Sequence, residues 1–320
     1  MWFVLSLACM LLWGSADLFY KKGTDGRDRY SHLKIAVWVG LVMGVFAVFL
    51  MPFSETRFSL SALLLNAAKY SPASLGYIVS MVIGYAGLRY LEVSVVSPVQ
   101  NASGAFSAIV MLIWFSAFGS FARIKEDYNL IDLVGTLIIV AGVIALAVVE
   151  QRLSAREREM PENERKYRFG ALALIFPLLY CLFDTLGTAA DGIILDDEKG
   201  LGLGEIDVLI IYGLTFFVAG VVAWLFLLLK NGRAYNPFAK TEKDKGVAAL
   251  FEEGGQIFYV YAMASKPILA APMVASYCIV SAILARLFIK EKLKTAQYAC
   301  VAAVIIGIVV LGISDGIKEG

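Results

Sequence analysis

The sequence is poor in charged residues and in side chains that hold metal ions. Asp, Glu, Lys and Arg make up 17% of the 320 residues, against about 25% in soluble proteins. There is one histidine, and the four cysteines all lie in apolar stretches without a CxxC or Cys/His metal spacing. No Ser/His/Asp group and no P-loop is recognisable. We therefore expect neither an enzyme nor a bound cofactor, and the net charge of +1 gives no indication of a nucleic-acid partner.

Hydrophobic residues are correspondingly abundant. They make up 59% of the chain, against roughly 45–50% in soluble domains, and the charged residues gather between the apolar runs. A membrane-spanning helix needs about 20 mostly apolar residues. Ten stretches qualify, near 2–20, 33–52, 73–91, 94–118, 130–149, 168–190, 206–229, 247–264, 267–289 and 295–314. The sequence therefore predicts an all-α polytopic membrane protein with ten transmembrane helices.

A charged linker divides these ten stretches into two sets of five. Residues 151–167 read QRLSAREREMPENERKY, in which charge forbids burial and Pro161 interrupts a helix. The expected organisation is therefore a first five-helix repeat over 1–150, the linker over 151–167 and a second five-helix repeat over 168–320.

Three short patterns recur in the same order in both halves. In the first pattern, Leu11-Leu12-Trp13 followed by Asp17 matches Leu178-Leu179-Tyr180 followed by Asp184. In the second, Pro98 followed by Ser107 matches Pro272 followed by Ser281. In the third, Lys125-Glu126 followed by Gly142 matches Lys290-Glu291 followed by Gly307. An odd number of helices in each repeat places the second copy in the opposite orientation. Inverted repeats are characteristic of secondary transporters, whose substrate site lies near the membrane midplane.

Several of these residues resemble the drug/metabolite transporter superfamily, in particular its EamA-type members. The resemblance rests on Trp13-Gly14-Ser15 with Lys21, on residues 84–90 (GYAGLRY) running into the Pro98 helix, and on the Lys-Glu turn in each half. It implies two five-helix repeats around a central cavity and alternating access without ATP. Ala16 departs from the pattern, because many relatives have Asn at this position.

Two indications of orientation disagree. The loops after the odd-numbered spans hold 21 Lys and Arg residues, and the remaining loops with the C-terminus hold 7. The positive-inside rule then places both termini, and the acidic stretch 191–207, outside, whereas the resemblance implies cytoplasmic termini. We expect a multi-pass protein of a bacterial inner membrane, either a monomer or a weak homodimer.

Four carboxylates fall inside apolar stretches, where an ionisable side chain costs about 2.5–3.5 kcal/mol and normally faces a cavity or a partner. They are Asp17, Asp184, Glu252 and Glu253. Helical spacing puts Trp13 beside Asp17, Tyr180 beside Asp184, and Glu252 in one stripe with Gln256 and Tyr259. Asp17 and Asp184 are also well placed for hydrogen bonds between helices.

The two glutamates break the internal repeat, because Ile78 and Val79 occupy the matching positions of the first half. A carboxylate among aromatic rings can hold an organic cation through charge and cation–π attraction, and a buried glutamate can carry a coupling proton. Candidate proton carriers are Glu252 and Glu253. The candidate substrate site consists of Trp13, Asp17, Tyr77, Tyr85, Gln100, Tyr180, Asp184, Tyr212, Glu252, Gln256, Tyr259 and Tyr277. Isolated tyrosines also commonly pack within the protein or lie at membrane interfaces.

The leading functional prediction is a secondary active transporter of a small organic cation, an amine or a choline-like compound, with protons as a candidate coupling ion. Export of amino acids or other zwitterionic or neutral metabolites is a second transport hypothesis. A membrane enzyme or a lipid-handling scaffold is the alternative from another class. Nucleotide sugars fit less well, since no span carries the interior Lys or Arg that a diphosphate needs.

Overall fold

The computed structural model describes residues 1–24, 28–54, 59–90, 93–119, 128–157, 175–196, 200–232, 234–290 and 294–319. Every regular element in these ranges is helical. The helices are α1 (Trp2–Gly23), α2 (Ser31–Leu50), η1 (Met51–Phe53), α3 (Leu60–Gly87), α4 (Val93–Asn101), α5 (Ser103–Phe118), α7 (Leu130–Glu157), α8 (Ile175–Ile194), α9 (Glu205–Asn231), η4 (Lys240–Glu242), α10 (Lys243–Ser265), α11 (Pro267–Ala275), α12 (Tyr277–Leu284), η5 (Ala285–Ile289) and α13 (Thr295–Glu319). Residues 158–174, the turn Lys125-Glu126 and Glu291 lie outside the described part of the chain.

Seven helical segments are long and apolar enough to cross a membrane. They are Trp2–Gly23, Ser31–Phe53, Val99–Phe118, Leu130–Val149, Glu205–Lys230, Pro267–Ile289 and Thr295–Lys318. Three further long helices, α3, α8 and α10, correspond to predicted spans but are not among these seven. Their polar side chains lower their hydropathy, and many of these groups are buried, as Asn66, Asp184 and Glu252 are. The protein is therefore a multi-pass membrane protein, and the number of ten spans stays a prediction.

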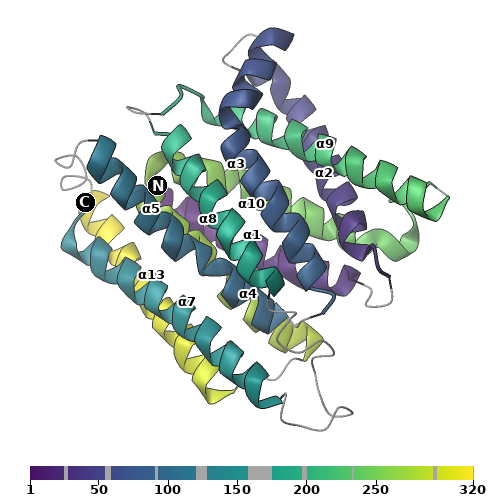
Figure 1. Ribbon diagram of the computed structural model, residues 1–320. Coiled ribbons are helices and arrows are strands. Elements are labelled where there is room, and N and C mark those ends of the chain that lie inside the picture. The colour runs from purple at the N-terminus through teal and green to yellow at the C-terminus, as the bar shows by residue number, and fades with distance from the viewer. Residues whose placement is uncertain are drawn as a thin grey trace.

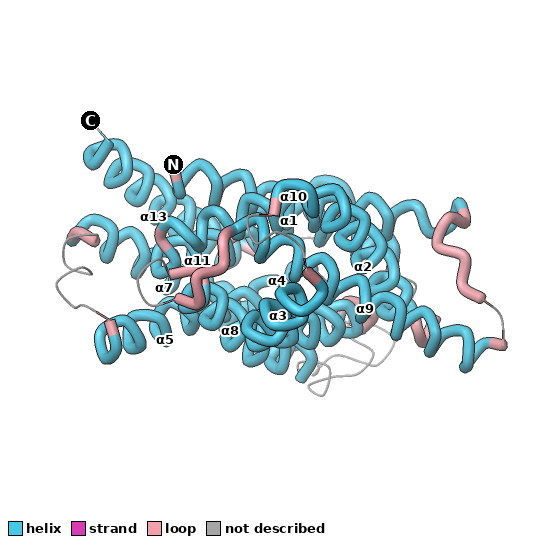
Figure 2. Tube along the Cα trace, turned by 90° about the horizontal axis from the view of Figure 1, so that it is seen from above, coloured by secondary structure: helices cyan, strands magenta, loops and turns pink. Residues whose placement is uncertain are grey.

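The long helices pack in pairs that join the two halves of the chain (Figures 1 and 2). Helix α1 lies along α10, α2 along α9, α3 along α8, and α7 along α13. The broken segment α4–α5 packs against α11–α12 in the same way, α5 on α11 and α4 on α12. In Figure 2 the α1–α10 pair and the α3–α8 pair lie along opposite edges of the bundle.

Both termini lie at the same end of the bundle. The indole of Trp2 donates a hydrogen bond to Asp315 over 2.7 Å, which joins the start of α1 to the end of α13. At the opposite end, the ammonium of Lys21 donates to the carbonyl of Leu88 over 2.9 Å, which joins the end of α1 to the end of α3. We call these the Asp315 end and the Lys21 end.

Two helical segments are interrupted at corresponding positions. The break between α4 and α5 falls at Ala102, and that between α11 and α12 falls at Ser276. Each follows a proline, Pro98 or Pro272, by four residues. At the second break the amide of Ser276 donates to the carbonyl of Met273, and its hydroxyl donates to that of Pro272 over 2.9 Å. The helix is thus tightened locally while its carbonyl groups keep their partners.

Small residues let these segments approach closely. A Cβ atom on Gly104 of α5 would lie 2.3 Å from the Cβ of Ala275 and 2.7 Å from the carbonyl oxygen of Ala271. Gly40 and Gly44 of α2 allow a similar approach of α9, because a Cβ on Gly40 would lie 2.5 Å from the carbonyl oxygen of Phe216. Close helix contacts of this kind are typical of membrane interiors.

Candidate functional site

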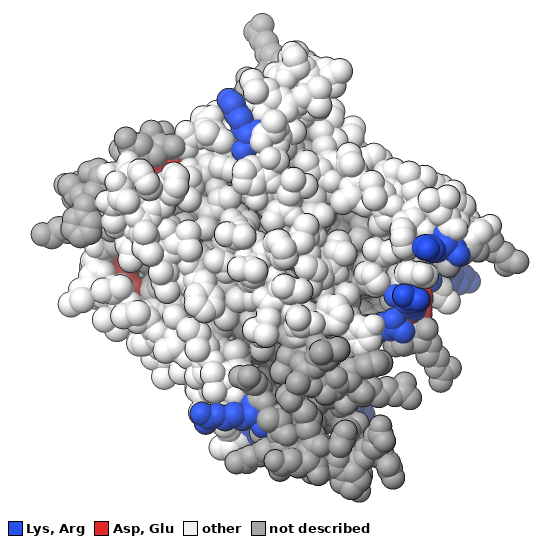
Figure 3. Space-filling view, in the orientation of Figure 1, with Lys and Arg blue, Asp and Glu red and all other residues white. Residues whose placement is uncertain are grey.

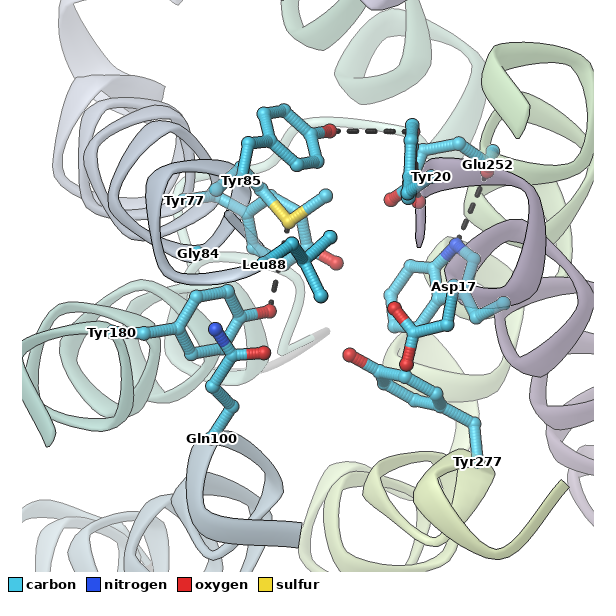
Figure 4. A pocket seen from close by; sticks show the side chains of 12 residues that line it. Asp17, Tyr20, Tyr77, Gly84, Tyr85, Leu88, Gln100, Tyr180, Glu252 and Tyr277 are labelled. Atoms are coloured by element: carbon cyan, nitrogen blue, oxygen red, sulfur yellow. Dashed lines mark hydrogen bonds between the residues drawn. The ribbon is translucent and has the colours of Figure 1, made fainter. Parts of the chain in front are cut away.

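A cavity lies in the interior of the bundle, toward the Lys21 end (Figure 4). Its free volume is about 20 Å³, enough for roughly one water molecule. Five helical segments contribute to it: α1, α3, α4, α8 and α10, together with the first residue of α12. The lining residues are Trp13, Asp17, Tyr20, Tyr77, Met81, Gly84, Tyr85, Leu88, Gln100, Tyr180, Glu252 and Tyr277.

Asp17 is held in place by two hydroxyl groups from the broken segments. Ser97 of α4 and Ser281 of α12 each donate a hydrogen bond of 2.7 Å to the same carboxylate oxygen, Oδ2. In Figure 4 the carboxylate points into the cavity beside the hydroxyl of Tyr277. The expected role in joining helices and the expected place in a cavity are therefore both observed for this residue.

Glu252 lines the same cavity as Asp17 and is 3% exposed. Its Oε2 accepts a hydrogen bond of 3.4 Å from the hydroxyl of Tyr20, which in turn accepts one of 3.2 Å from that of Tyr85. The backbone carbonyl of Glu252 accepts a hydrogen bond of 3.1 Å from the indole of Trp13. This last contact is possible because Gly255 has no side chain: a Cβ at that position would lie 2.2 Å from the indole.

A second cavity of about 20 Å³ adjoins the first and shares four of its rings, Trp13, Tyr77, Tyr180 and Tyr277. Its remaining lining residues are Asn101, Ser103, Gly104, Asp184, Thr188, Tyr259, Ala271, Val274 and Ala275. Oδ2 of Asp184 accepts a hydrogen bond of 2.6 Å from the hydroxyl of Ser103. Its other oxygen has no hydrogen-bond partner among the described residues, so a buried acceptor is left unsatisfied.

The four shared rings separate two acidic regions. The ring centroid of Trp13 lies 5.9 Å from that of Tyr77 and 5.8 Å from that of Tyr277. Asp17 and Glu252 line the cavity on one side of these rings, and Asp184 lines that on the other. The described lining of both cavities contains no Lys or Arg. The arrangement can therefore attract positive charge and bind it to ring faces.

Both ends of this region are closed by side chains. Toward the Lys21 end, the Tyr20–Tyr85 hydrogen bond joins α1 to α3, and the ring centroids are 4.8 Å apart. Toward the Asp315 end, the hydroxyl of Tyr70 donates to Asp191, which joins α3 to α8. Asp191 is 1% exposed and is thus a buried residue of α8. A ligand larger than water needs one of these closures to open.

The structure brings together most of the predicted substrate-site residues. Ten of the twelve line one or both cavities: Trp13, Asp17, Tyr77, Tyr85, Gln100, Tyr180, Asp184, Glu252, Tyr259 and Tyr277. Their role in binding stays a prediction.

Three predicted residues lie outside both linings. Tyr212 packs behind Tyr77, with ring centroids 5.5 Å apart. Gln256 is 1% exposed, and neither atom of its amide has a partner among the described residues. Glu253 is 8% exposed and lines neither cavity, unlike its neighbour Glu252.

Tyr20, which lines the first cavity, was not among the predicted site residues, and neither were Ser97 and Ser281, which contact Asp17. Tyr20 follows Asp17 by three positions and Trp13 by seven, so helical spacing alone places it on the same face. Ser97 and Ser281 have no comparable signal, because their contact with Asp17 depends on how separate helices pack. Among the described residues, no group of three or more His, Cys, Asp or Glu side chains is placed to hold a metal ion.

These features define an integral, multi-pass α-helical membrane protein with an acidic, aromatic interior. Residues 199–313 match the EamA-like transporter family, which confirms, for the second half of the chain, the resemblance to the drug/metabolite transporter superfamily. Over these residues the chain is similar to a family of membrane transporters.

The fold itself also has a solved counterpart. A crystal structure described only as that of a protein aligns with 99% of this chain and 98% of its own, with a TM-score of 0.59 and 13% sequence identity. At this identity the likeness shows a shared fold alone. No curated protein matches the chain in sequence.

Proposed function

We propose that the protein is a secondary active transporter that moves a small organic cation, an amine or a choline-like compound, by alternating access. The observation that carries this proposal is the pairing of Asp17 and Glu252 in one cavity with six aromatic rings and no described Lys or Arg. Each desolvated contact between a cation and a ring contributes about 2 kcal/mol. The two carboxylates supply negative charge, which attracts a cationic substrate and which a neutral metabolite does not need.

Ten spans in two inverted five-helix repeats are the proposed scaffold. The helix pairs support it, because a twofold relation between the halves exchanges the pair α1–α10 with the pair α3–α8 and maps α2–α9 and α7–α13 onto themselves. The helix breaks also occur at equivalent positions of the two halves, since Ala102 and Ser276 are as far apart in the sequence as Pro98 and Pro272 are. The hydrogen bond of Trp2 to Asp315 supports an even number of crossings, and ten spans agree with this.

Alternating access would use the two closures in turn. Opening the Tyr20–Tyr85 contact would admit a ligand from the Lys21 end, and opening the Tyr70–Asp191 contact would admit it from the Asp315 end. The two contacts involve different partners of α3, namely α1 and α8. Movement of α3 relative to these helices would therefore favour one opening at the expense of the other.

Glu252 is the proposed carrier of a coupling proton. Its carboxylate has only the long hydrogen bond from Tyr20 among the described side chains, and it shares the cavity with the second carboxylate, Asp17. A bound cation and a bound proton would compete for this site, which is the requirement for antiport. The position of Glu253 outside both linings does not support the same role for it.

One observation favours the second transport hypothesis, a zwitterionic substrate such as an amino acid. Gln100 lines the cavity, and its amide nitrogen has no acceptor among the described residues. Gln100 lies on the opposite side of the cavity from Asp17 (Figure 4). A rotation of its amide would direct the unpartnered donor to the carboxylate of a substrate whose ammonium group lies beside Asp17 and Glu252. The two hypotheses differ in whether the carboxylate of the ligand matters.

A thermal-stability screen of the purified protein distinguishes these proposals. Ligand at 100 times its Kd stabilises a protein by about 2.7 kcal/mol, which raises Tm by several degrees. We expect tetramethylammonium or choline to raise Tm and matched amino acids to do so less. Stabilisation by amino acids alone would favour the zwitterion hypothesis, and stabilisation by neither would contradict the transport site in both forms. The proposed location is a bacterial inner membrane.

A further inference from the structure

An open groove runs along the outside of the bundle, separate from the interior cavities. Its volume is about 780 Å³, and its sides are formed by α2, α3 and α9, with Phe176 of α8. The greater part of the lining is aliphatic or small: Leu33, Ala36, Leu75, Ile78, Val82, Ala86, Val218, Ala219, Val222 and Ala223. None of the described residues that line it is acidic.

Basic and aromatic side chains collect at one end of this groove. Arg29 and His32 lie on either side of the first residue of α2, and Arg89 follows the end of α3. The guanidinium of Arg29 lies 5.8 Å from the ring centroid of Tyr30. The guanidinium of Arg89 lies 5.4 Å from the ring centroid of Tyr90. All of these residues belong to the Lys21 end. Arg and Tyr at such a level are typical of the membrane interface.

The acidic neighbour of Arg29 is engaged elsewhere. Asp28 forms an ion pair of 2.6 Å with Lys34. Partial burial acts to raise the pKa of Asp28, but the hydrogen bonds from Lys34 and from the backbone amide of Tyr30, with the charges of Lys34 and Lys245, together lower it. Asp28 is therefore paired with Lys34, which is not among the residues that line the groove.

The length of the apolar part matches one leaflet of a bilayer. Leu75 and Ala86 mark its extent on α3, and Thr215 and Phe226 mark it on α9. Eleven residues of helix rise about 16 Å, close to half of the 30 Å hydrocarbon core. In the orientation of Figure 3, the Lys and Arg side chains that can be seen lie toward the edges, and the broad face between them is uncharged. The groove thus has an apolar length and a cationic end at the depths where a phospholipid has its acyl chain and its phosphate.

We propose that this groove is a binding site for an anionic phospholipid. The acyl chain lies between α3 and α9, and the phosphate lies between Arg29 and Arg89, with His32 beside them. Arginine suits this position because its planar guanidinium can donate two parallel hydrogen bonds to phosphate. A lipid held there contacts both α2–α9 and α3, and α3 is the helix whose movement would open the interior cavity under the proposed alternating access.

Lipid titration of the full-length, delipidated protein tests the proposal, with bound lipid counted by native mass spectrometry. The probes are phosphatidylglycerol and phosphatidylcholine with identical acyl chains. Each basic group near the surface contributes roughly fivefold to anionic-lipid binding, so the wild type should prefer phosphatidylglycerol roughly 30-fold. The double variant Arg29→Gln/Arg89→Gln should lose most of this preference. The control Lys22→Gln, which removes a cation of the Lys21 end outside the groove, should keep it.

The apolar part of the site is tested separately. Ala219→Trp fills the groove and should weaken binding of both lipids, whereas Val309→Trp, at an exposed position of α13, should not. Equal affinity of the wild type for the two lipids would overturn the proposal, and this measurement needs no variant to fold. An unchanged preference in the arginine double variant would also overturn it. The same holds if millimolar inorganic phosphate displaces phosphatidylglycerol and Ala219→Trp binds lipid as the wild type does.

Discussion

Replacement of Glu252 by Gln should weaken cation binding by roughly 100-fold. The amide has nearly the shape of the carboxylate and can still accept the hydrogen bond of Tyr20, so the change removes charge and little else. For a cationic nitrogen about 5 Å from the carboxylate, an effective dielectric constant near 20 gives roughly 3 kcal/mol. Each 1.4 kcal/mol is a factor of ten, and Asp17 retains part of the attraction.

The assay is competition by choline or tetramethylammonium against a labelled cation on purified protein, with Glu253→Gln as the matched control. Glu253 is also buried and has the same side chain, but it lines neither cavity. We expect the control to change the Kd by less than about threefold. Equal losses in the two variants would show that the effect is general destabilisation or a long-range field. No loss in Glu252→Gln would refute the assignment of the cation site.

Three further predictions concern the same interior. Asp17→Asn should raise the Kd for the cation at least about tenfold in the competition assay, and an unchanged Kd would limit Asp17 to a structural role. Tyr85→Phe removes the hydrogen bond that closes the Lys21 end, so a cysteine placed at Leu88 should react with a soluble maleimide several-fold faster in this background; an equal rate would contradict the proposed closure. Gly104→Ala should lower the free energy of unfolding by about 1–3 kcal/mol, because its Cβ would lie 2.3 Å from a neighbouring side chain. A Cβ on Gly316 would meet nothing within 4 Å, so Gly316→Ala should not lower the thermal midpoint, because Ala favours a helix more than Gly does. Equal midpoints for both variants would contradict the packing described for α5.

Helix positions could largely be predicted from hydrophobic length, but their boundaries were less predictable where a helix carries polar residues. The expected span at 73–91 is a helix that begins at Leu60. Asn66, Lys69 and Pro72 weaken the apolar signal of its first half, yet Asn66 is buried against other helices. A proline within a helix removes one hydrogen bond, which a packed bundle tolerates. Likewise, α7 continues to Glu157, so the first seven residues of the expected linker are helical.

The candidate site was predictable where it depends on one helix at a time. Trp13 and Asp17 lie on one face of α1 by spacing alone, and the same rule places Glu252 with Tyr259. Contacts between helices were not predictable in this way. The hydroxyl groups that hold Asp17 come from residues 97 and 281, and the acidic stretch assigned to an outer loop begins with a residue buried against Tyr70.

Counterflow in proteoliposomes tests the central claim most directly. Vesicles that contain the protein and are preloaded with unlabelled choline should accumulate labelled choline from outside, because an alternating-access site exchanges one for the other. Glu252→Gln should abolish this accumulation, and Glu253→Gln should retain it. Wild-type vesicles that exchange neither choline nor any other small cation tested, while exchanging a neutral or zwitterionic metabolite, would contradict the proposed cation site.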